Sequence, residues 1–95
     1  SIKNNSFFPN NIKINNCYPN PFNSEITIKF FTNHQNLSLS IYDINGKLIN
    51  TFFSGIIKKG HYSIKWNANQ HPSGLYIIKL ISKESVKTQK IMFLK

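Results

Sequence analysis

Apolar and polar residues alternate one by one in several stretches of this chain, and this alternation constrains its fold more than any other feature. Ile26, Ile28 and Phe30 occupy every second position of one stretch, and the same period recurs in residues 37–42 and 62–67. A period of two places one set of side chains on a core face and the other toward water, as in half-buried strands. No stretch of 11 or more residues has a helical period. The pattern therefore predicts an all-β fold.

Turn residues separate these stretches and set the number of strands. Asn45-Gly46 lies between two alternating stretches, and this dipeptide readily takes the positive φ angles of a type I′ hairpin turn. Further turns are predicted at residues 58–60 and 82–85, and a longer loop at residues 67–74. The predicted strands cover residues 12–17, 25–32, 37–44, 47–54, 60–66, 74–82 and 86–94.

Seven short strands in one small domain predict a β-sandwich of the immunoglobulin or fibronectin-III type, with Trp66 and Tyr76 in its core. A chain of 95 residues is long enough for one core, so we expect a linker in residues 1–11 and a single domain in residues 12–95. No apolar run approaches the roughly 18 residues of a membrane span. The first residues include no Met and no apolar signal-peptide region, which predicts a processed product or a piece of a larger protein.

The ionisable residues offer little material for catalysis or metal binding. The three carboxylates are far apart in the sequence, and the three histidines lie in or beside predicted turns, where we expect solvent exposure; these residues are Glu25, Asp43, Glu84, His34, His61 and His71. The single cysteine, Cys17, excludes an internal disulfide, and we expect a small thiol packed under the first strand. A cysteine-dependent enzyme would require Cys17 to be exposed beside a histidine. The prediction is a protein that is not an enzyme and has no metal site and no cofactor.

The charge of the chain is strongly positive. Twelve lysines, no arginine and three acidic residues give a formal net charge of +9. Such a charge suits nucleic acids, acidic glycans or an anionic membrane surface. Lys29, Lys65, Lys79 and Lys87 fall at predicted outward positions of strands, as on a solvated sheet face. Arginine supplies the fork that reads bases, so its absence argues against sequence-specific DNA binding, and we expect no nucleic-acid partner.

The segment Tyr18-Pro19-Asn20-Pro21-Phe22-Asn23 is the most unusual stretch of the chain. Two prolines fix φ twice and favour extended geometry at the residues before them. The sequence predicts a stiff, near-polyproline corner between the first two strands, which Tyr18 and Phe22 pin to the core. The alternative is that this segment is a recognition element.

Five segments in order resemble a known family. The segment 18–23 with the strand after it resembles the opening of the C-terminal sorting domain (type A) of the type IX secretion system. Leu39-Ser40-Ile41-Tyr42-Asp43-Ile44-Asn45-Gly46-Lys47 is similar to the central hairpin of that family. Further similar segments are residues 60–67, 73–80 and 90–95. Comparable segments occur in the immunoglobulin-like domain of flagellar hook-capping proteins.

The resemblance implies that this domain is an export address for a cargo that precedes it in the parent chain. The cargo would pass through the periplasm after Sec export. An outer-membrane translocon and its shuttle barrel would then recognise the domain. A sortase-like cysteine protease would cut before Ile12, and the cargo would reach the outer membrane, the cell surface or the extracellular space. The alternative function is a non-catalytic adhesion or glycan-binding module of a secreted enzyme.

The resemblance also suggests which residues the translocon recognises. The last strand, residues 86–95, is expected at a sheet edge with no following segment to cover it, so a receptor could bind it by strand addition. Its lysines would steer the domain toward an acidic receptor surface, and two turn glycines would provide positive φ angles or close backbone approach. The predicted recognition residues are Pro19, Asn20, Pro21, Gly46, Gly74, Lys87, Lys90 and Lys95.

Overall fold

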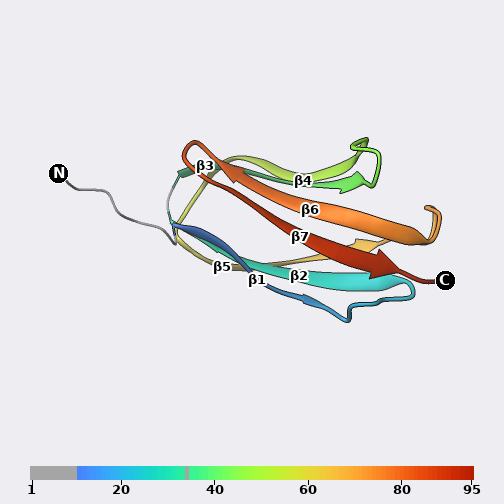
Figure 1. The fold of residues 1–95 in the computed structure, drawn as a ribbon. Coiled ribbons are helices and arrows are strands. Elements are labelled where there is room, and N and C mark those ends of the chain that lie inside the picture. Colours follow the sequence, from blue (N-terminus) through green and yellow to red (C-terminus); the bar gives the residue numbers. More distant parts are fainter. Residues whose placement is uncertain (1–10, 34) are drawn as a thin grey trace.

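The computed structural model describes residues 11–33 and 35–95, and these form two packed antiparallel sheets (Figure 1). The strands are β1 (Ile12–Tyr18), β2 (Glu25–Thr32), β3 (Gln35–Asp43), β4 (Leu48–Ile57), β5 (Gly60–Asn67), β6 (Gly74–Ser82) and β7 (Val86–Phe93). The all-β prediction and the seven strands are confirmed. The fourth strand was predicted to end at residue 54, because the alternation of apolar and polar residues stops early there. In the structure β4 is longer, and its last three residues also pair with β3.

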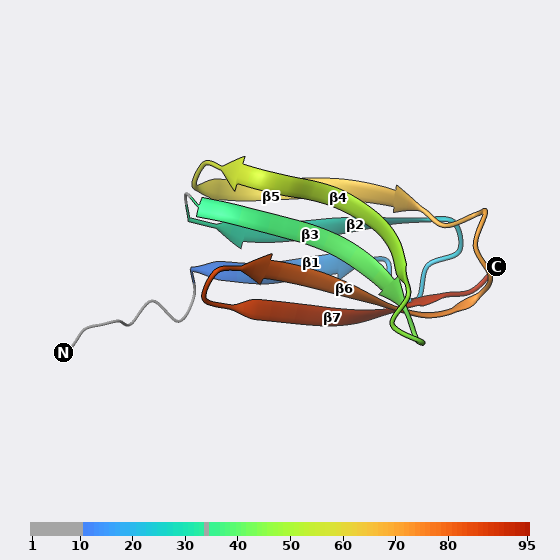
Figure 2. The same cartoon turned by 90° about the horizontal axis from the view of Figure 1, so that it is seen from above.

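The strands divide into a three-stranded sheet with the order β1-β2-β5 and a four-stranded sheet with the order β4-β3-β6-β7. Figure 2 shows the two layers from above, with the β1–β2, β3–β4 and β5–β6 connections at the end of the sandwich where the chain terminates. The start of β1 lies at the opposite end. The last strand lies at a sheet edge, as expected.

The core lies between the sheets and is built from the inward residues of the alternating stretches. Ile26, Ile28 and Phe30 are at most 1% exposed, and Trp66 and Tyr76 are buried as predicted. Such side chains each contribute roughly 1.5–3 kcal/mol of hydrophobic stabilisation when they leave water. Because the single cysteine cannot form an internal disulfide, this packing holds the two sheets together.

The turn between β3 and β4 occurs where it was predicted but is of a different type. A type I′ turn would close with a bond between Ile44 and Lys47. Instead, the Gly46 N–H donates to the Asp43 carbonyl at 3.0 Å, and the Asp43 N–H donates to the Lys47 carbonyl at 2.9 Å. This pattern is that of a three-residue loop in which Gly46, with φ of 85°, follows a type I turn. The type I′ prediction was wrong because the Asp43 carboxylate also accepts from the N–H groups of Asn45 and Lys47, which favours the longer loop.

Candidate recognition site at the C-terminal end of the sandwich

Most of the predicted recognition residues gather at the end of the sandwich that holds the C-terminus (Figures 1 and 2). The β1–β2 loop, the β3–β4 turn and the start of β6 lie at this end because the strands that they join run antiparallel. The predicted residues located here are Pro19, Asn20, Pro21, Gly46, Gly74 and Lys95. Gly46 lies on the β4 side of the four-stranded sheet, away from β7. Lys90 lies further back along β7, and Lys87 lies toward the opposite end.

The side chain of Asn20 pairs with the outer edge of β7. Its amide nitrogen donates to the Lys90 carbonyl at 3.4 Å, and its amide oxygen accepts from the Met92 N–H at 3.0 Å. The segment forms bends at residues 19–21, so the prediction of a near-polyproline corner was wrong. The peptide bonds that precede Pro19 and Pro21 are cis. Proline has no backbone N–H, and the carboxamide of Asn20 supplies a donor and an acceptor where the adjacent backbone cannot supply both.

Phe22 continues this pairing with its backbone. The Phe22 N–H donates to the Met92 carbonyl at 3.0 Å, and the Leu94 N–H donates to the Phe22 carbonyl at 2.9 Å. These two bonds form a parallel bridge between Phe22 and Phe93. The carboxamide of Asn20 makes the same pattern of bonds around the residue two positions earlier in β7. We call residues 19–22 the edge clamp, because they cover the edge of the last strand from Lys90 to Leu94.

An aromatic cluster anchors the edge clamp in the core. The ring of Phe22 stacks on Phe93 with 5.1 Å between centroids and lies 6.0 Å from Trp66, which in turn meets Tyr76 at 5.3 Å. All four side chains are at most 6% exposed. The hydroxyl of Tyr76 donates to the Pro72 carbonyl at 2.6 Å and so ties the β5–β6 loop to the same cluster. The prediction that Phe22 pins the corner to the core is confirmed. The same prediction for Tyr18 was wrong, because Tyr18 is 41% exposed and lies outside the core.

The edge clamp corrects the expectation that no segment covers the last strand. In an antiparallel strand, alternate residues direct their backbone groups toward opposite neighbours, so Val86, Thr88, Lys90 and Met92 face away from β6. The clamp occupies the second half of this edge. Of the two halves of β7, the first is the one whose outward backbone groups have no partner in the described part of the chain. Strand addition along the whole of β7 is therefore blocked unless the clamp moves.

Lys87 does not lie on the outer face of the sheet, as the sequence suggested. It pairs with the buried Leu80 and shares the inward face of β7 with Ile91 and Phe93. Lys90 is on the outer face. The two lysines thus belong to opposite faces of one strand. An inward-pointing charge on an edge strand is a common protection against edge-to-edge pairing, and Lys87 lies in the half that the clamp leaves open.

The two predicted glycines serve the shape of this end. Gly46 has φ of 85° and Gly74 has φ of 151°, and side-chain-bearing residues rarely adopt either value. Gly74 pairs with Phe93 at the start of β6. Beside it, the Ser73 hydroxyl accepts from the Lys95 N–H at 3.1 Å, which fixes the last residue. The sequence analysis missed Ser73, since one serine in a polar loop carries no distinguishing signal.

The cysteine and the histidines of the described residues do not form a reactive site. Cys17 is partly buried against the core, and this burial raises the pKa of its thiol to about 11. The thiol is therefore protonated at neutral pH, whereas nucleophilic cysteines have a lowered pKa. The ring of His61 packs on Phe31 and that of His71 on Trp66. The prediction for His34 lies outside the described residues.

Neither a metal cluster nor a membrane-spanning helix is found in the described part of the chain. No group of three or more His, Cys, Asp or Glu residues there could hold a metal ion. Residues 11–33 and 35–95 include no helix that is long and apolar enough to cross a membrane.

Burial, with a smaller effect of the Asp43 carboxylate, raises the pKa of Tyr76, which keeps its hydroxyl protonated as a donor to the Pro72 carbonyl.

Comparison with known proteins supplies one match. The model of a family described as the secretion system C-terminal sorting domain matches residues 16–94. No curated protein and no solved structure matched the chain. The matched segment includes the whole edge clamp, the aromatic cluster and β7.

Proposed function

Since the chain belongs to the family of secretion system C-terminal sorting domains, we propose that an outer-membrane translocon recognises the end of the sandwich that carries the edge clamp. The domain is a C-terminal sorting signal for type IX secretion and directs export through the outer membrane to the cell surface or the extracellular space. The observation that carries the proposal is the clamp itself. It makes one surface out of residues 19–22 and 90–95, which belong to two of the five segments that resemble the family.

The position of the two chain ends supports this assignment. The start of β1 and Lys95 lie at opposite ends of the sandwich, as Figure 1 shows. A cargo that precedes β1 would therefore join the domain far from the proposed recognition surface. A translocon could bind the clamp end without a clash with the cargo.

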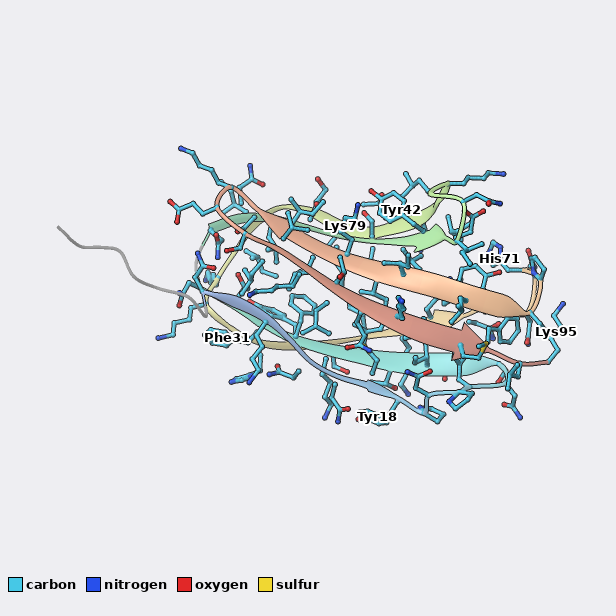
Figure 3. The ribbon with its side chains drawn as sticks, in the orientation of Figure 1. Tyr18, Phe31, Tyr42, His71, Lys79 and Lys95 are labelled. Atoms are coloured by element: carbon cyan, nitrogen blue, oxygen red, sulfur yellow. The ribbon has the colours of Figure 1, made fainter. Side chains whose placement is uncertain are left out.

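The exposed lysines of this end fit an acidic receptor. Lys90 and Lys95 are exposed, and Lys95 places its ammonium 6.0 Å from the Phe93 ring centroid (Figure 3). Complementary charge raises association rates and helps to exclude wrong partners. We propose that these two lysines steer the domain, with Pro19, Asn20 and Pro21 giving the surface its shape. Lys87, on the inward face, has the separate task of protecting the open edge.

We further propose the remaining steps that the family resemblance implies. The cargo passes through the periplasm, a shuttle barrel receives it after translocation, and a sortase-like cysteine protease cuts before Ile12. Residues 1–11 would then act as the linker that presents the cut site, since proteases need an extended and accessible backbone. Residues 12–95 would remain folded as the discarded signal.

An immunoglobulin-like assignment of the sandwich is also proposed. The order of the strands differs from that of an immunoglobulin constant domain only in the fourth strand, which here pairs with the third. The bond from the Tyr76 hydroxyl to the Pro72 carbonyl is comparable to the tyrosine corner near the start of the sixth strand in such domains. We also propose a relation to the hook-capping domains, which rests on the similar sequence segments and not on the sandwich architecture, since unrelated domains share that architecture.

The test is delivery of a fluorescent reporter fused before this chain, in a host that has the secretion machinery. The double variant Lys90→Glu/Lys95→Glu reverses two charges at the clamp end, and Lys58→Glu/Lys59→Glu reverses two at the opposite end. We expect the first to reduce surface delivery about tenfold, with the reporter held in the periplasm, and the second to leave it unchanged. Equal delivery by both variants, at unchanged melting temperatures, would overturn the assignment of the clamp end. Removal of residues 90–95 should abolish delivery as well, but it also deletes the buried Ile91 and Phe93.

A further inference from the structure

We propose that the outer face of the three-stranded sheet binds an anionic saccharide, a sugar whose rings carry carboxylate, sulfate or phosphate groups beside their hydroxyls. This site goes beyond the sorting function and uses none of the residues of the clamp end. It rests on a shallow hollow of about 530 Å³ over strands β1, β2 and β5. The hollow is lined by Asn15, Asn16, Lys29, His61, Tyr62 and Ser63.

The register of the sheet explains why these side chains meet. Asn16 pairs with Lys29, and Lys29 pairs with Ser63, so the three form one row across the outer face. The register shifts between Ile14 and Asn16, which leaves Asn15 as an extra residue in β1. Such a bulge re-aims a side chain and is common next to binding sites. Two amides, an ammonium and a hydroxyl thus converge on one row.

Aromatic side chains border this row on both sides. Tyr18 is 41% exposed, and the Lys29 ammonium lies 5.6 Å from its ring centroid. On the other side, Phe31 and His61 pack with 5.0 Å between their ring centroids. Figure 3 shows Tyr18 and Phe31 on the outer side of this sheet, away from the core. Flat apolar faces beside a row of amides and hydroxyls suit a sugar ring, which has both apolar C–H faces and polar edges.

The charges of the face select an anion. None of the six lining residues is acidic, and Lys29 lies at the centre of the row. Lys13 and Lys65 pair with Phe31 and Thr27 in the neighbouring rows. The acidic residue of this face, Glu25, pairs with Asn67 one row beyond Lys65 and does not line the hollow. Charge-assisted bonds from an ammonium to a carboxylate, sulfate or phosphate oxygen are stronger than bonds between neutral groups. A neutral sugar could not form such a charge-assisted bond with Lys29.

The chain offers a matched control for the central lysine. Lys79 lies on the outer face of the other sheet, with its ammonium 4.7 Å from the Tyr42 ring centroid (Figure 3). Lys29→Gln and Lys79→Gln therefore remove the same charge from a similar aromatic contact on opposite faces. A third variant, Ser63→Phe, would fill the hollow with a side chain at an exposed position and leave the net charge unchanged.

The experiment measures binding of the 95-residue chain to alginate, heparin and uncharged dextran by calorimetry, with melting temperatures as the check of folding. We expect alginate or heparin to bind, dextran to bind at least tenfold more weakly, and Lys29→Gln and Ser63→Phe to lose about tenfold in affinity. Lys79→Gln should change the affinity less than about twofold, because Lys79 does not line the hollow and its neighbours in the row, Ser40 and Thr88, offer hydroxyls but no amide. The proposal is overturned if neither acidic polysaccharide binds, or if both lysine variants weaken binding equally, which would indicate diffuse attraction to a +9 domain. Double-stranded DNA that binds as tightly, with the same dependence on Lys29, would overturn the choice of a saccharide.

Discussion

The outer edge of β7 is closed in one half and open in the other. From Lys90 to Leu94 it is covered by the edge clamp, through bonds from the Asn20 carboxamide and the Phe22 backbone. From Val86 to Gln89 the outward backbone groups have no such partner in the described part of the chain, and the inward Lys87 lies in this half. This domain therefore protects one strand edge by two different means: by pairing in the half of β7 near Lys95, and by charge in the other half.

The largest effect is expected at the anchor of the closed half. Phe22→Ala removes a side chain that is 2% exposed, stacks on Phe93 and contacts Trp66, and we expect a loss of about 3–5 kcal/mol in the free energy of unfolding. Val86→Ala, in the open half, removes a side chain that is 57% exposed and should cost less than about 0.5 kcal/mol. Urea unfolding measures both. Similar losses in the two variants would mean that the clamp is not anchored as described.

A smaller effect is expected from the carboxamide itself. Asn20→Ala removes two bonds to β7 at an exposed position, so we expect a loss of about 1 kcal/mol in stability. Hydrogen exchange gives a sharper measurement, because the Met92 amide should exchange several-fold faster while the unpaired amide of Thr88 keeps its rate. Asn23→Ala, just outside the clamp, is the control. An unchanged Met92 rate in Asn20→Ala would show that the side chain does not hold this edge.

The strands could be predicted from the sequence because their signal is local. Alternation and turn residues act over a few positions, and the two sheets then follow from which faces are apolar. The clamp could not be predicted, because Asn20 and its partners are 70 and 72 residues apart and a side-chain amide leaves no periodic pattern. The prediction that Lys87 lies on the outer face of the sheet was wrong for another reason. Thr88, Gln89 and Lys90 are all polar, so the alternation that identifies the two faces is lost there.

Cys17 offers a test through pH. The thiol pKa is about 11 in the folded protein because of burial, against 9.0 for a free thiol. Between these values the unfolded chain binds fewer protons than the native one, so the contribution of Cys17 to stability is complete below pH 9 and falls as the pH rises to 11. We expect the stability difference between the wild type and Cys17→Ala to shrink over that range, as followed by thermal unfolding. A stability difference that does not change with pH would mean that the thiol is exposed to solvent. The end of β1, from which the clamp starts, would then be less well packed than described.

The smallest effect on stability is expected from substitutions of two lysines of β7. These substitutions test most directly whether the closed and open halves of the β7 edge differ. Lys87→Val and Lys90→Val each remove one charge from the same strand, and each should change stability by no more than about 0.5 kcal/mol. They should differ in association. Lys87→Val leaves the open half without its inward charge, so pairing with the edge of a second copy becomes favourable, and sedimentation should detect dimers or larger species.

Lys90→Val should remain monomeric under the same conditions, because the clamp already occupies the edge beside it. Adding Asn20→Ala to Lys90→Val would then expose both the apolar face and part of the edge, and association should appear. If Lys90→Val alone, without Asn20→Ala, associates as readily as Lys87→Val, the clamp does not shield the edge, and the contrast between the two halves of β7 has no physical consequence. If neither associates at millimolar concentration, the inward position of Lys87 does not protect the edge, and the bend and twist of β7 must do so instead.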